Sequence, residues 1–274
     1  MLIAFDIGNT NTVLGVYRDG KMVTSWRMET DARKSADEYG MLVSMFFSHS
    51  GLSMNEVDDV IIATVVPSVM YTIRHMTKKY FKKDAIVVES GIKTGLIVKY
   101  DNPKAVGSDR IVNAVAAHEK YPGNLIIIDL GTATTFCAVT AKGEYLGGTI
   151  APGLKISSTA LFEMTAQLPK VELEAPGHAI CRSTISGMQS GLIYGHMGMV
   201  EFIVGMMKKE LAEQTGSDEP ITVIATGGLS TMIQSGVKCI DVVDRELTLD
   251  GLAIIYEKNK HHHRKNHKMC GEER

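Results

Sequence analysis

One pattern occurs twice in this chain and constrains its fold more than any other feature of the sequence. Each copy is an apolar, strand-like run that ends in Asp and is followed by one residue, a glycine and several Thr or Asn residues. Adding 123 to the residue number superimposes Asp6 on Asp129 and Gly8 on Gly131. A match at one long offset indicates an internal duplication rather than a short-period solenoid. The same offset superimposes Thr12 on Thr135, Val16 on Val139 and Gly20 on Gly143.

The duplication predicts two similar α/β domains. A second pair of apolar runs, residues 60–64 and 222–226, also repeats between the halves. We expect domains at residues 1–117 and 118–258, followed by a polar, His-rich tail at 259–274 without regular structure. Because small ligands usually bind where domains meet, we expect a cleft between the two domains to hold the site.

Hydrophobic periodicity and turn residues predict the elements between these landmarks. Asp19-Gly20 between two β-rich runs predicts a hairpin turn. The run over 59–66 is too continuously apolar for a half-exposed strand and predicts one buried on both faces, as in a parallel sheet. Other strands are expected at 2–5, 13–17, 22–28, 125–128, 136–140, 145–150 and 221–226, and helices at 36–49, 67–81, from 110 onward and at 182–209.

Composition excludes several classes of protein. The chain carries 29 Lys and Arg against 31 Asp and Glu, a balance that argues against a nucleic-acid-binding protein. No apolar run approaches the roughly 20 residues that a membrane helix needs, and no secretory signal follows Met1. The four cysteines form no CxxC pair and are expected to be reduced thiols. We therefore expect a cytoplasmic protein with no membrane and no nucleic-acid partner.

The two Asp-x-Gly turns suit phosphate chemistry. Backbone N–H groups of a tight glycine turn can bind phosphate oxygens, and a carboxylate beside them can hold a metal ion or a metal-bound water that bridges to the phosphates. The alternative for each turn is a plain β-hairpin with a capping Asp. Two copies, together with a strand that runs into Gly227-Gly228 and a helix start, favour nucleotide binding.

Other phosphate-binding and hydrolytic motifs are absent from the sequence. The chain contains no GxxxxGK[ST] and no GxGxxG, which argues against P-loop and Rossmann mechanisms. It also contains no HExxH and no GxSxG, so zinc protease and hydrolase functions lack support.

Taken together, these segments resemble the two phosphate motifs and the adenosine motif of the superfamily that contains actin, the sugar kinases and the heat-shock ATPases. Within that superfamily, residues 1 to about 258 most closely resemble the type III pantothenate kinases. The resemblance implies two duplicated ribonuclease-H-like (actin-like ATPase) domains with a cleft between them. The segments that carry it are Asp6-x-Gly8-Asn9-Thr10, Asp129-x-Gly131-Thr132, Ala225-Thr226-Gly227-Gly228, Tyr100-Asp101-Asn102-Pro103, Gly107-Ser108-Asp109-Arg110 and the run from Gly147 to Gly153.

The resemblance also implies an activity and a set of site residues. Type III pantothenate kinases transfer the γ-phosphoryl group of ATP to the primary hydroxyl of pantothenate, the first step of coenzyme A biosynthesis. They use Mg²⁺ and a monovalent cation, K⁺ or NH₄⁺, and act as homodimers. Asp109 matches their catalytic base and Asp129 their monovalent-cation ligand. The matching ATP-binding residues are Asp6, Ile7, Gly8, Asn9, Thr10, Asn11, Thr12, Val13 and Thr132, and the matching pantothenate contacts are Tyr100, Gly107, Ser108, Asp109, Arg110 and Thr184.

Several of these residues also have a plainer structural explanation. Ser108 or Asp109 can be the N-cap of the helix that follows. Arg110 can hold a carboxylate or a phosphate, or make a surface ion pair. Thr184 can meet an anion at a helix N-terminus or simply cap that helix. The scattered histidines are expected to be structural, because none has a partner at metal-ligand spacing: His49, His75, His118, His178 and His196.

Three glycines four residues apart, Gly187, Gly191 and Gly195, share one face of the helix expected at 182–209. This face indicates either a close helix contact in the core or a subunit interface.

Two other functions stay open at this point. The first is a kinase of the same superfamily that acts on a sugar or another small alcohol, because a fold alone does not set the substrate; Tyr100 with 107–110 is the feature that discriminates it. The second is a nucleotide-binding regulator or an actin-like assembly subunit without turnover. The presence of Asp109 argues for catalysis.

Overall fold

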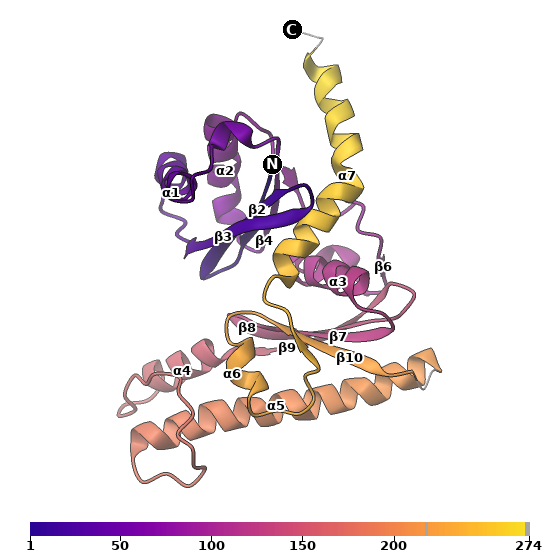
Figure 1. The fold of residues 1–274 in the computed structure, drawn as a ribbon. Coiled ribbons are helices and arrows are strands. Elements are labelled where there is room, and N and C mark those ends of the chain that lie inside the picture. Colours follow the sequence, from indigo (N-terminus) through magenta and orange to yellow (C-terminus); the bar gives the residue numbers. More distant parts are fainter. Residues whose placement is uncertain (217–218, 272–274) are drawn as a thin grey trace. The chain divides into compact units, whose positions relative to one another are not determined.

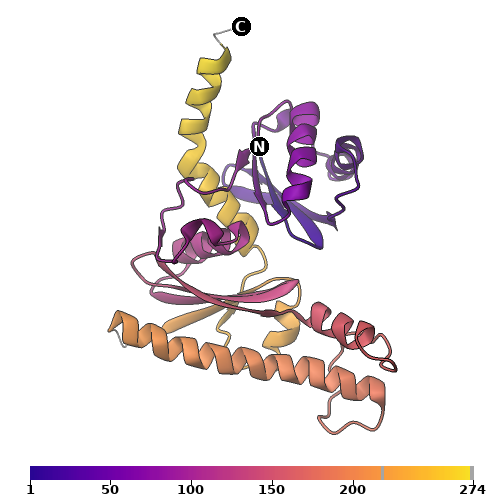
Figure 2. The same ribbon diagram turned by 180° about the vertical axis from the view of Figure 1, so that it is seen from behind.

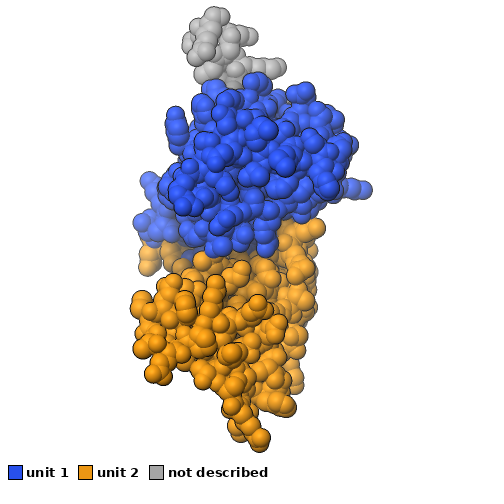
Figure 3. Space-filling model, turned by 90° about the vertical axis from the view of Figure 1, so that its left-hand side faces the viewer, with its two compact units in different colours: residues 1–95, 102–116, 247–274 blue, residues 96–101, 117–246 orange. Residues whose placement is uncertain are grey.

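The chain forms two compact units (Figure 3). Each unit is built on one mixed β-sheet. The computed structural model describes residues 1–216 and 219–271, with the backbone alone at residues 262 and 264–271. Unit 1 consists of residues 1–95 and 102–116 together with the chain from Leu247 on. Unit 2 consists of residues 96–101 and 117–246.

The sheet of unit 1 has buried strands at its centre. Its strands are β1 (Leu2–Ile7), β2 (Asn11–Arg18), β3 (Lys21–Glu29), β4 (Asp59–Thr64) and β5 (Ile86–Val87), in the order β3-β2-β1-β4-β5 (Figure 1). β1 pairs antiparallel with β2 and parallel with β4. Val60, Ile61, Ile62 and Ala63 are fully buried, which confirms the prediction of a strand covered on both faces.

Helices cover both faces of this sheet. The apolar faces of α1 (Ala36–His49) and α2 (Pro67–Met76) share one core cluster with β1 and β4. α1 begins where expected because Ser35 and Glu38 form a capping box. α7 (Leu247–Gly271) packs on the opposite face, where Leu249 lies against Gly15 of β2. The remaining elements are the π-helical turn η2 (Thr77–Phe81), the 3₁₀ turns η1 (Met54–Glu56) and η3 (Pro103–Ala105), and α3 (Ser108–Lys120), which starts in this unit.

The sheet of unit 2 repeats the first topology. Its strands are β6 (Ile97–Val98), β7 (Asn124–Leu130), β8 (Ala133–Val139), β9 (Glu144–Pro152), β10 (Ile221–Thr226) and β11 (Val242–Val243). The order is β11-β10-β7-β8-β9-β6, with β7 antiparallel to β8 and parallel to β10. β7 to β11 thus take the places of β1 to β5, with β10 and β11 in those of β4 and β5, and β6 is added at one edge. The fold is α/β with duplicated units, as the sequence predicts.

One face of this second sheet is covered by three helices, α4 (Leu154–Glu163), α5 (Thr184–Thr215) and α6 (Ser230–Gln234) (Figure 2). α5 runs beside the whole width of the sheet and supplies most of the helical residues of the core cluster. It begins after the N-cap Ser183 and ends at Gly216, which adopts the left-handed conformation typical of a helix end.

The two hairpins differ in length by one residue, which the constant offset of 123 does not show. In the first hairpin, Ile7 pairs with Thr12, and in the second, Leu130 pairs with Thr134. Thr12 is therefore equivalent to Thr134 and not to Thr135. The second turn is one residue shorter because a single residue, Thr132, takes the place of Asn9 and Thr10 between the glycine and the next strand.

The units exchange two segments relative to the expected halves. Residues 96–101 join unit 2 because Ile97 and Val98 pair with β9. The chain from Leu247 on joins unit 1 because α7 hydrogen-bonds there: the Tyr17 hydroxyl donates to Asp250 Oδ1 at 2.9 Å, and the Thr248 hydroxyl donates to Asn113 Oδ1 at 2.7 Å. A single boundary along the sequence cannot describe units that are each made of separate segments.

The polar tail also differs from the expectation of no regular structure. α7 continues through it as far as Gly271, and residues 272–274 lie outside the described residues. Asn259 Nδ2 donates to the Lys93 carbonyl oxygen at 2.8 Å, and His263 Nε2 lies 3.2 Å from the Asp84 carbonyl oxygen. These contacts hold the middle of α7 against the rest of unit 1. Adding residues to an existing helix costs little free energy, so the helix can continue beyond these contacts.

The glycine face of α5 is open. A Cβ at Gly187, Gly191 or Gly195 would meet no atom within 4 Å. This excludes the close core contact and leaves the face exposed in this chain. In the part of the chain that the structure describes, no helix combines the length and apolarity needed to cross a membrane.

Gly251 allows α7 and α3 to cross closely, so Gly251→Ala should destabilise unit 1. A Cβ at Gly251 would lie 2.2 Å from the Val112 carbonyl oxygen, and the helices can accommodate it only by separating. We expect a loss of roughly 1–3 kcal/mol in the free energy of unfolding, measured by urea denaturation. Ser48→Ala, at an exposed residue of α1, is the control and should change the free energy of unfolding by no more than about 0.5 kcal/mol. Equal effects of the two substitutions would contradict the close crossing.

Candidate active site

The turn between β1 and β2 presents exposed residues on a tightly held base. The Gly8 N–H donates to the Asn11 carbonyl oxygen at 3.0 Å, and the Thr30 N–H donates to the Thr10 carbonyl oxygen at 3.0 Å. Asn9 and Thr10 are exposed at the tip, whereas Ile7 and Thr12 are fully buried. The side chains of Ile7 and Thr12 therefore support the turn, and its tip is the part that can meet a ligand.

The first residues of α3 lie at the same sheet edge as this turn. The Ser108 hydroxyl donates to the Thr64 carbonyl oxygen at 2.9 Å, and Thr64 is paired with Ile7. Because parallel β1 and β4 end at the same edge, this hydrogen bond brings Gly107–Arg110 next to the end of β1. Ser108 thus ties α3 to the sheet, which is a different task from the helix cap considered above.

Asp109 has a largely desolvated carboxylate. Burial raises the pKa of this carboxyl above its usual range, and the N–H and the charge of Arg110 offset part of the rise. Its Oδ1 accepts from the Arg110 N–H at 2.8 Å. Arg110 itself is only 5% exposed, so it is not the surface ion pair that was one alternative. A carboxylate of raised pKa beside a buried cation is suited to accept a proton.

In unit 2 three glycine-bearing segments meet at the second turn. The Gly131 N–H donates to the Ala133 carbonyl oxygen at 3.1 Å, the same bond that Gly8 makes in unit 1. A Cβ at Gly153 would lie 2.3 Å from the Thr132 carbonyl oxygen, so only glycine allows the start of α4 to touch the turn. Gly227, at φ +90°, also approaches closely: its Cβ would lie 2.7 Å from both Asp129 Oδ1 and the Leu130 carbonyl oxygen. The structure thus brings Asp129, Thr132 and the Gly227 turn together.

Tyr100 lies on β9. A Cβ at Gly147 would meet the Tyr100 ring at 3.4 Å, and the ring centroid is 6.4 Å from that of Tyr145. Gly147, at φ +120°, is in a conformation that favours glycine. The half-buried tyrosine therefore rests on a bare stretch of backbone.

Thr184 stands apart from the other predicted residues of unit 2. It is exposed in the first turn of α5, and Ser183, not Thr184, caps the helix by accepting from the Ser186 N–H. Thr184 precedes His196 by three turns and a third of α5, about 18 Å along the axis at 1.5 Å per residue. His196 is the residue of α5 that hydrogen-bonds to Thr134, at the start of β8.

His196 makes a contact that the sequence did not predict. Its Nε2 lies 3.0 Å from the Thr134 hydroxyl, and both side chains are buried. Burial lowers the pKa of the imidazole, so it is neutral near pH 7. From the sequence, His196 was only one of five scattered histidines, since its partner is 62 residues away.

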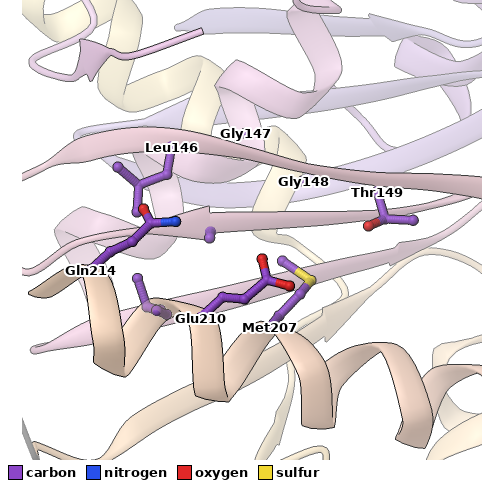
Figure 4. A pocket seen from close by; sticks show the side chains of 9 residues that line it. Leu146, Gly147, Gly148, Thr149, Met207, Glu210 and Gln214 are labelled. Atoms are coloured by element: carbon purple, nitrogen blue, oxygen red, sulfur yellow. The ribbon is translucent and has the colours of Figure 1, made fainter.

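A cavity of about 170 Å³ in unit 2 contains none of the predicted site residues (Figure 4). Glu210 and Gln214 of α5 point from the helix toward the bare backbone of Gly147 and Gly148. Within the described residues, no three His, Cys, Asp or Glu side chains gather in a way that could hold a metal. A metal carried by nucleotide phosphates needs only one or two protein carboxylates, so this finding is compatible with Mg²⁺.

Among solved structures, a conserved putative Baf family transcriptional activator from Campylobacter jejuni aligns with 94% of this chain and 99% of its own, at 16% identity and a TM-score of 0.58. This likeness establishes a shared fold. Two further structures align more loosely. An inorganic polyphosphate/ATP-glucomannokinase from Arthrobacter sp. strain KM has 14% identity and a TM-score of 0.49, with 94% of this chain and 98% of its own covered. An activator of 2-hydroxyisocaproyl-CoA dehydratase from Clostridium difficile has 12% identity and a TM-score of 0.48, with 97% of each chain covered.

The comparison with protein families is more specific. Residues 2–206 match the model of the family described as type III pantothenate kinase, a match that covers well over half of the chain and includes both Asp-x-Gly turns and the Gly107–Arg110 run. The chain belongs to the type III pantothenate kinase family.

Proposed function

We propose that the protein transfers the γ-phosphoryl group of ATP to the primary hydroxyl of pantothenate, which yields 4′-phosphopantothenate and begins coenzyme A biosynthesis. Family membership supports the broader statement that the chain is an ATP-using kinase. The observation that carries the proposal is the position of Asp109: a desolvated carboxylate held at the edge of the sheet where the first Asp-x-Gly turn also lies.

In this proposal the two turns bind the phosphates of ATP. Phosphoryl transfer depends mainly on positioning and on neutralising charge, and backbone N–H groups of tight turns serve both needs. The tip formed by Asn9 and Thr10 and the Thr132 turn are the accessible parts of the predicted ATP-binding set. The buried members, Ile7 and Thr12, keep the first turn in shape.

Asp109 then accepts the proton of the pantothenate hydroxyl as that oxygen attacks the γ-phosphorus. The raised pKa of its carboxyl favours this task. Arg110 supplies the positive charge for the pantothenate carboxylate or a phosphate, and Tyr100 offers a flat apolar surface. Gly107, Ser108 and Thr184 complete the proposed substrate contacts.

The residues around the turns fit the cations that the family uses. Asp129 Oδ1 and the Leu130 carbonyl oxygen converge where Gly227 has no side chain, and such an all-oxygen cradle suits a hard cation such as K⁺ or NH₄⁺. Asp6, at the end of β1, is the carboxylate placed to hold Mg²⁺, directly or through water. When bound, these ions would neutralise the charge of the transferring phosphoryl group.

The proposal also includes a homodimer in the cytoplasm. α5 exposes large apolar side chains in line with its open glycines: Phe202 is 69% and Met206 48% exposed. An apolar stripe of this kind is typical of a surface covered by a partner. The cytoplasm is where ATP is available, and the described cysteines, Cys137, Cys181 and Cys239, are free thiols, as expected there.

The decisive experiment measures ADP release from ATP with and without pantothenate, in K⁺ and in Na⁺ buffer, for the wild type and Asp109→Asn. We expect pantothenate-dependent and K⁺-dependent turnover that falls about 10²–10⁴-fold in the variant, the usual contribution of a general base. Because the base must be deprotonated and burial raises its pKa, the wild-type rate should fall as the pH drops through that raised value. Asp19→Asn, at an exposed aspartate in the turn between β2 and β3, is the matched control and should leave kcat within a few-fold.

Two outcomes would redirect the assignment. Turnover without pantothenate dependence, but with another small alcohol, would indicate a kinase of different specificity. ATP binding with no acceptor at all would favour a regulator, and an increase in light scattering on adding ATP would favour an assembly subunit.

Gly153→Ala should weaken ATP binding through the second turn. The added methyl group would lie 2.3 Å from the Thr132 carbonyl oxygen and must displace it. We expect KM for ATP to rise about tenfold or more, since each lost or misplaced hydrogen bond to a charged group costs roughly 1.5–3 kcal/mol. Gly51→Ala, in the turn after α1, where a Cβ meets nothing within 4 Å, is the control. An unchanged KM for ATP in Gly153→Ala would remove the second turn from the ATP site.

Phe202→Glu should dissociate the dimer, because it places a charge in the exposed apolar stripe of α5. Size-exclusion chromatography with light scattering should report two chains per particle for the wild type and one for the variant. Tyr71→Glu, at a residue of α2 that is 78% exposed, should leave the particle mass unchanged. A wild type of single-chain mass would refute the dimer.

A further inference from the structure

We infer that His196 is a positioning residue: through its hydrogen bond to Thr134 it holds the second turn, Gly131–Thr132, in the shape that binds nucleotide phosphates. The inference rests on the proposed function only in taking a nucleotide as the ligand of this turn. His196 would touch neither ATP nor pantothenate.

The contact joins two groups that have lost their water. His196 is 6% exposed, Thr134 is 1% exposed, and the Nε2–Oγ1 distance is 3.0 Å. A buried hydroxyl or imidazole nitrogen that loses its hydrogen bond costs more than a solvated one, because no water replaces the partner. Each side chain therefore restrains the position of the other.

Thr134 is well placed to pass this restraint to the turn. It is paired with Leu130, so these two residues close the hairpin whose loop contains Gly131 and Thr132. The Gly131 N–H donates to the carbonyl oxygen of Ala133, the residue directly before Thr134. A shift of Thr134 therefore moves the acceptor that shapes the turn.

The same arrangement occurs in unit 1 with a different partner. Thr12, the equivalent of Thr134, is fully buried, and its hydroxyl lies 2.9 Å from that of Thr30. Thr30 also donates its N–H to the Thr10 carbonyl oxygen within the turn. Both turns thus have a buried threonine whose hydroxyl is held from outside the hairpin, by Thr30 in one unit and by His196 in the other. Because unrelated residues restrain the equivalent threonines of the two units, we take this restraint to be required for the function of the turns.

α5 makes His196 a rigid anchor. Ile193, Met197 and Val200 on the same face of α5 are buried in the core of unit 2. The imidazole cannot swing away without disturbing this packing. The position of the turn is consequently set against the longest helix of the unit.

The test compares ADP binding, by isothermal titration calorimetry, in the wild type and five variants. Thr134→Val and His196→Phe should each raise the Kd for ADP roughly fivefold, the effect of one lost hydrogen bond. The double variant should be no weaker than either single one, because both remove the same bond. His196→Gln, whose amide can still reach the threonine hydroxyl, should return the Kd to within about twofold of the wild type.

Ser190→Ala is the matched control. Ser190 is a buried residue of the same helix, and its hydroxyl donates to the Ala179 carbonyl oxygen at 3.2 Å, away from the turn. It should leave the Kd unchanged while lowering thermal stability as much as Thr134→Val does. Kinetics add a second readout: KM for ATP should rise in Thr134→Val while KM for pantothenate stays within twofold, a split that a general loss of stability would not produce.

The outcomes separate this inference from the proposed function. An unchanged Kd in Thr134→Val, equal weakening by Ser190→Ala, or additive effects in the double variant would each overturn the role of His196. Absence of ADP binding in the wild type would overturn it as well. If ADP binds and the variants behave as expected but pantothenate is not phosphorylated, the proposed substrate fails and the positioning role stands. Should His196→Phe not fold, Thr134→Val alone decides.

Discussion

The structure depends on one arrangement of hydrogen bonds, made once in each unit: a central strand that pairs antiparallel with the next strand and parallel with a later one. The antiparallel partner requires a tight turn at the end of the central strand, and the parallel partner ends at the same edge. In unit 1 this brings the Asp-x-Gly turn beside the anchor of α3 at Thr64. In unit 2 it brings Asp129 beside the Gly227 turn, since Asp129 is paired with Thr226.

Close contacts of backbone with backbone set the positions of the segments around this arrangement. At Gly153, Gly227 and Gly251 a methyl group would lie within 2.7 Å of a carbonyl oxygen. These three contacts set, in order, the start of α4 on the second turn, the glycine turn against Asp129, and α7 against the helix that carries Asp109. Side chains then restrain what the backbone brings together, as Thr30 and His196 do for the two turns. The raised pKa of Asp109 follows from the same packing, because the hydrogen bond from Ser108 to Thr64 holds the first turn of α3 at the sheet edge, where the Asp109 carboxylate is desolvated.

Local sequence predicted the elements whose signals are themselves local. The helix at Ala36–His49 begins at its capping box, and the strand at Asp59–Thr64 shows itself as an unbroken apolar run. The hairpin turn places both Asp19 and Gly20 at positive φ. Asp and Gly tolerate this conformation, so the pair predicts the turn. Predictions that depended on distant contacts were less accurate. The exchange of two segments between units and the contacts that hold the middle of α7 involve residues far along the chain. The one-residue difference between the hairpins is set by strand register, which a constant offset along the sequence does not show.

The sequence by itself determined the duplication, the strands and turns around each Asp-x-Gly motif, and the family, because these are encoded in spacing and in short runs around Asp, Gly and Thr. Tertiary structure alone decided which residues support the turns and which face outward. Thr12 and Thr10 have the same side chain two positions apart, yet one is fully buried and the other is exposed. His196 is indistinguishable in sequence from the other histidines until α5 lies on β8. The physical reason is that burial and hydrogen bonding depend on neighbours in space, and the neighbours of these residues come from segments that only folding brings to the same sheet edge.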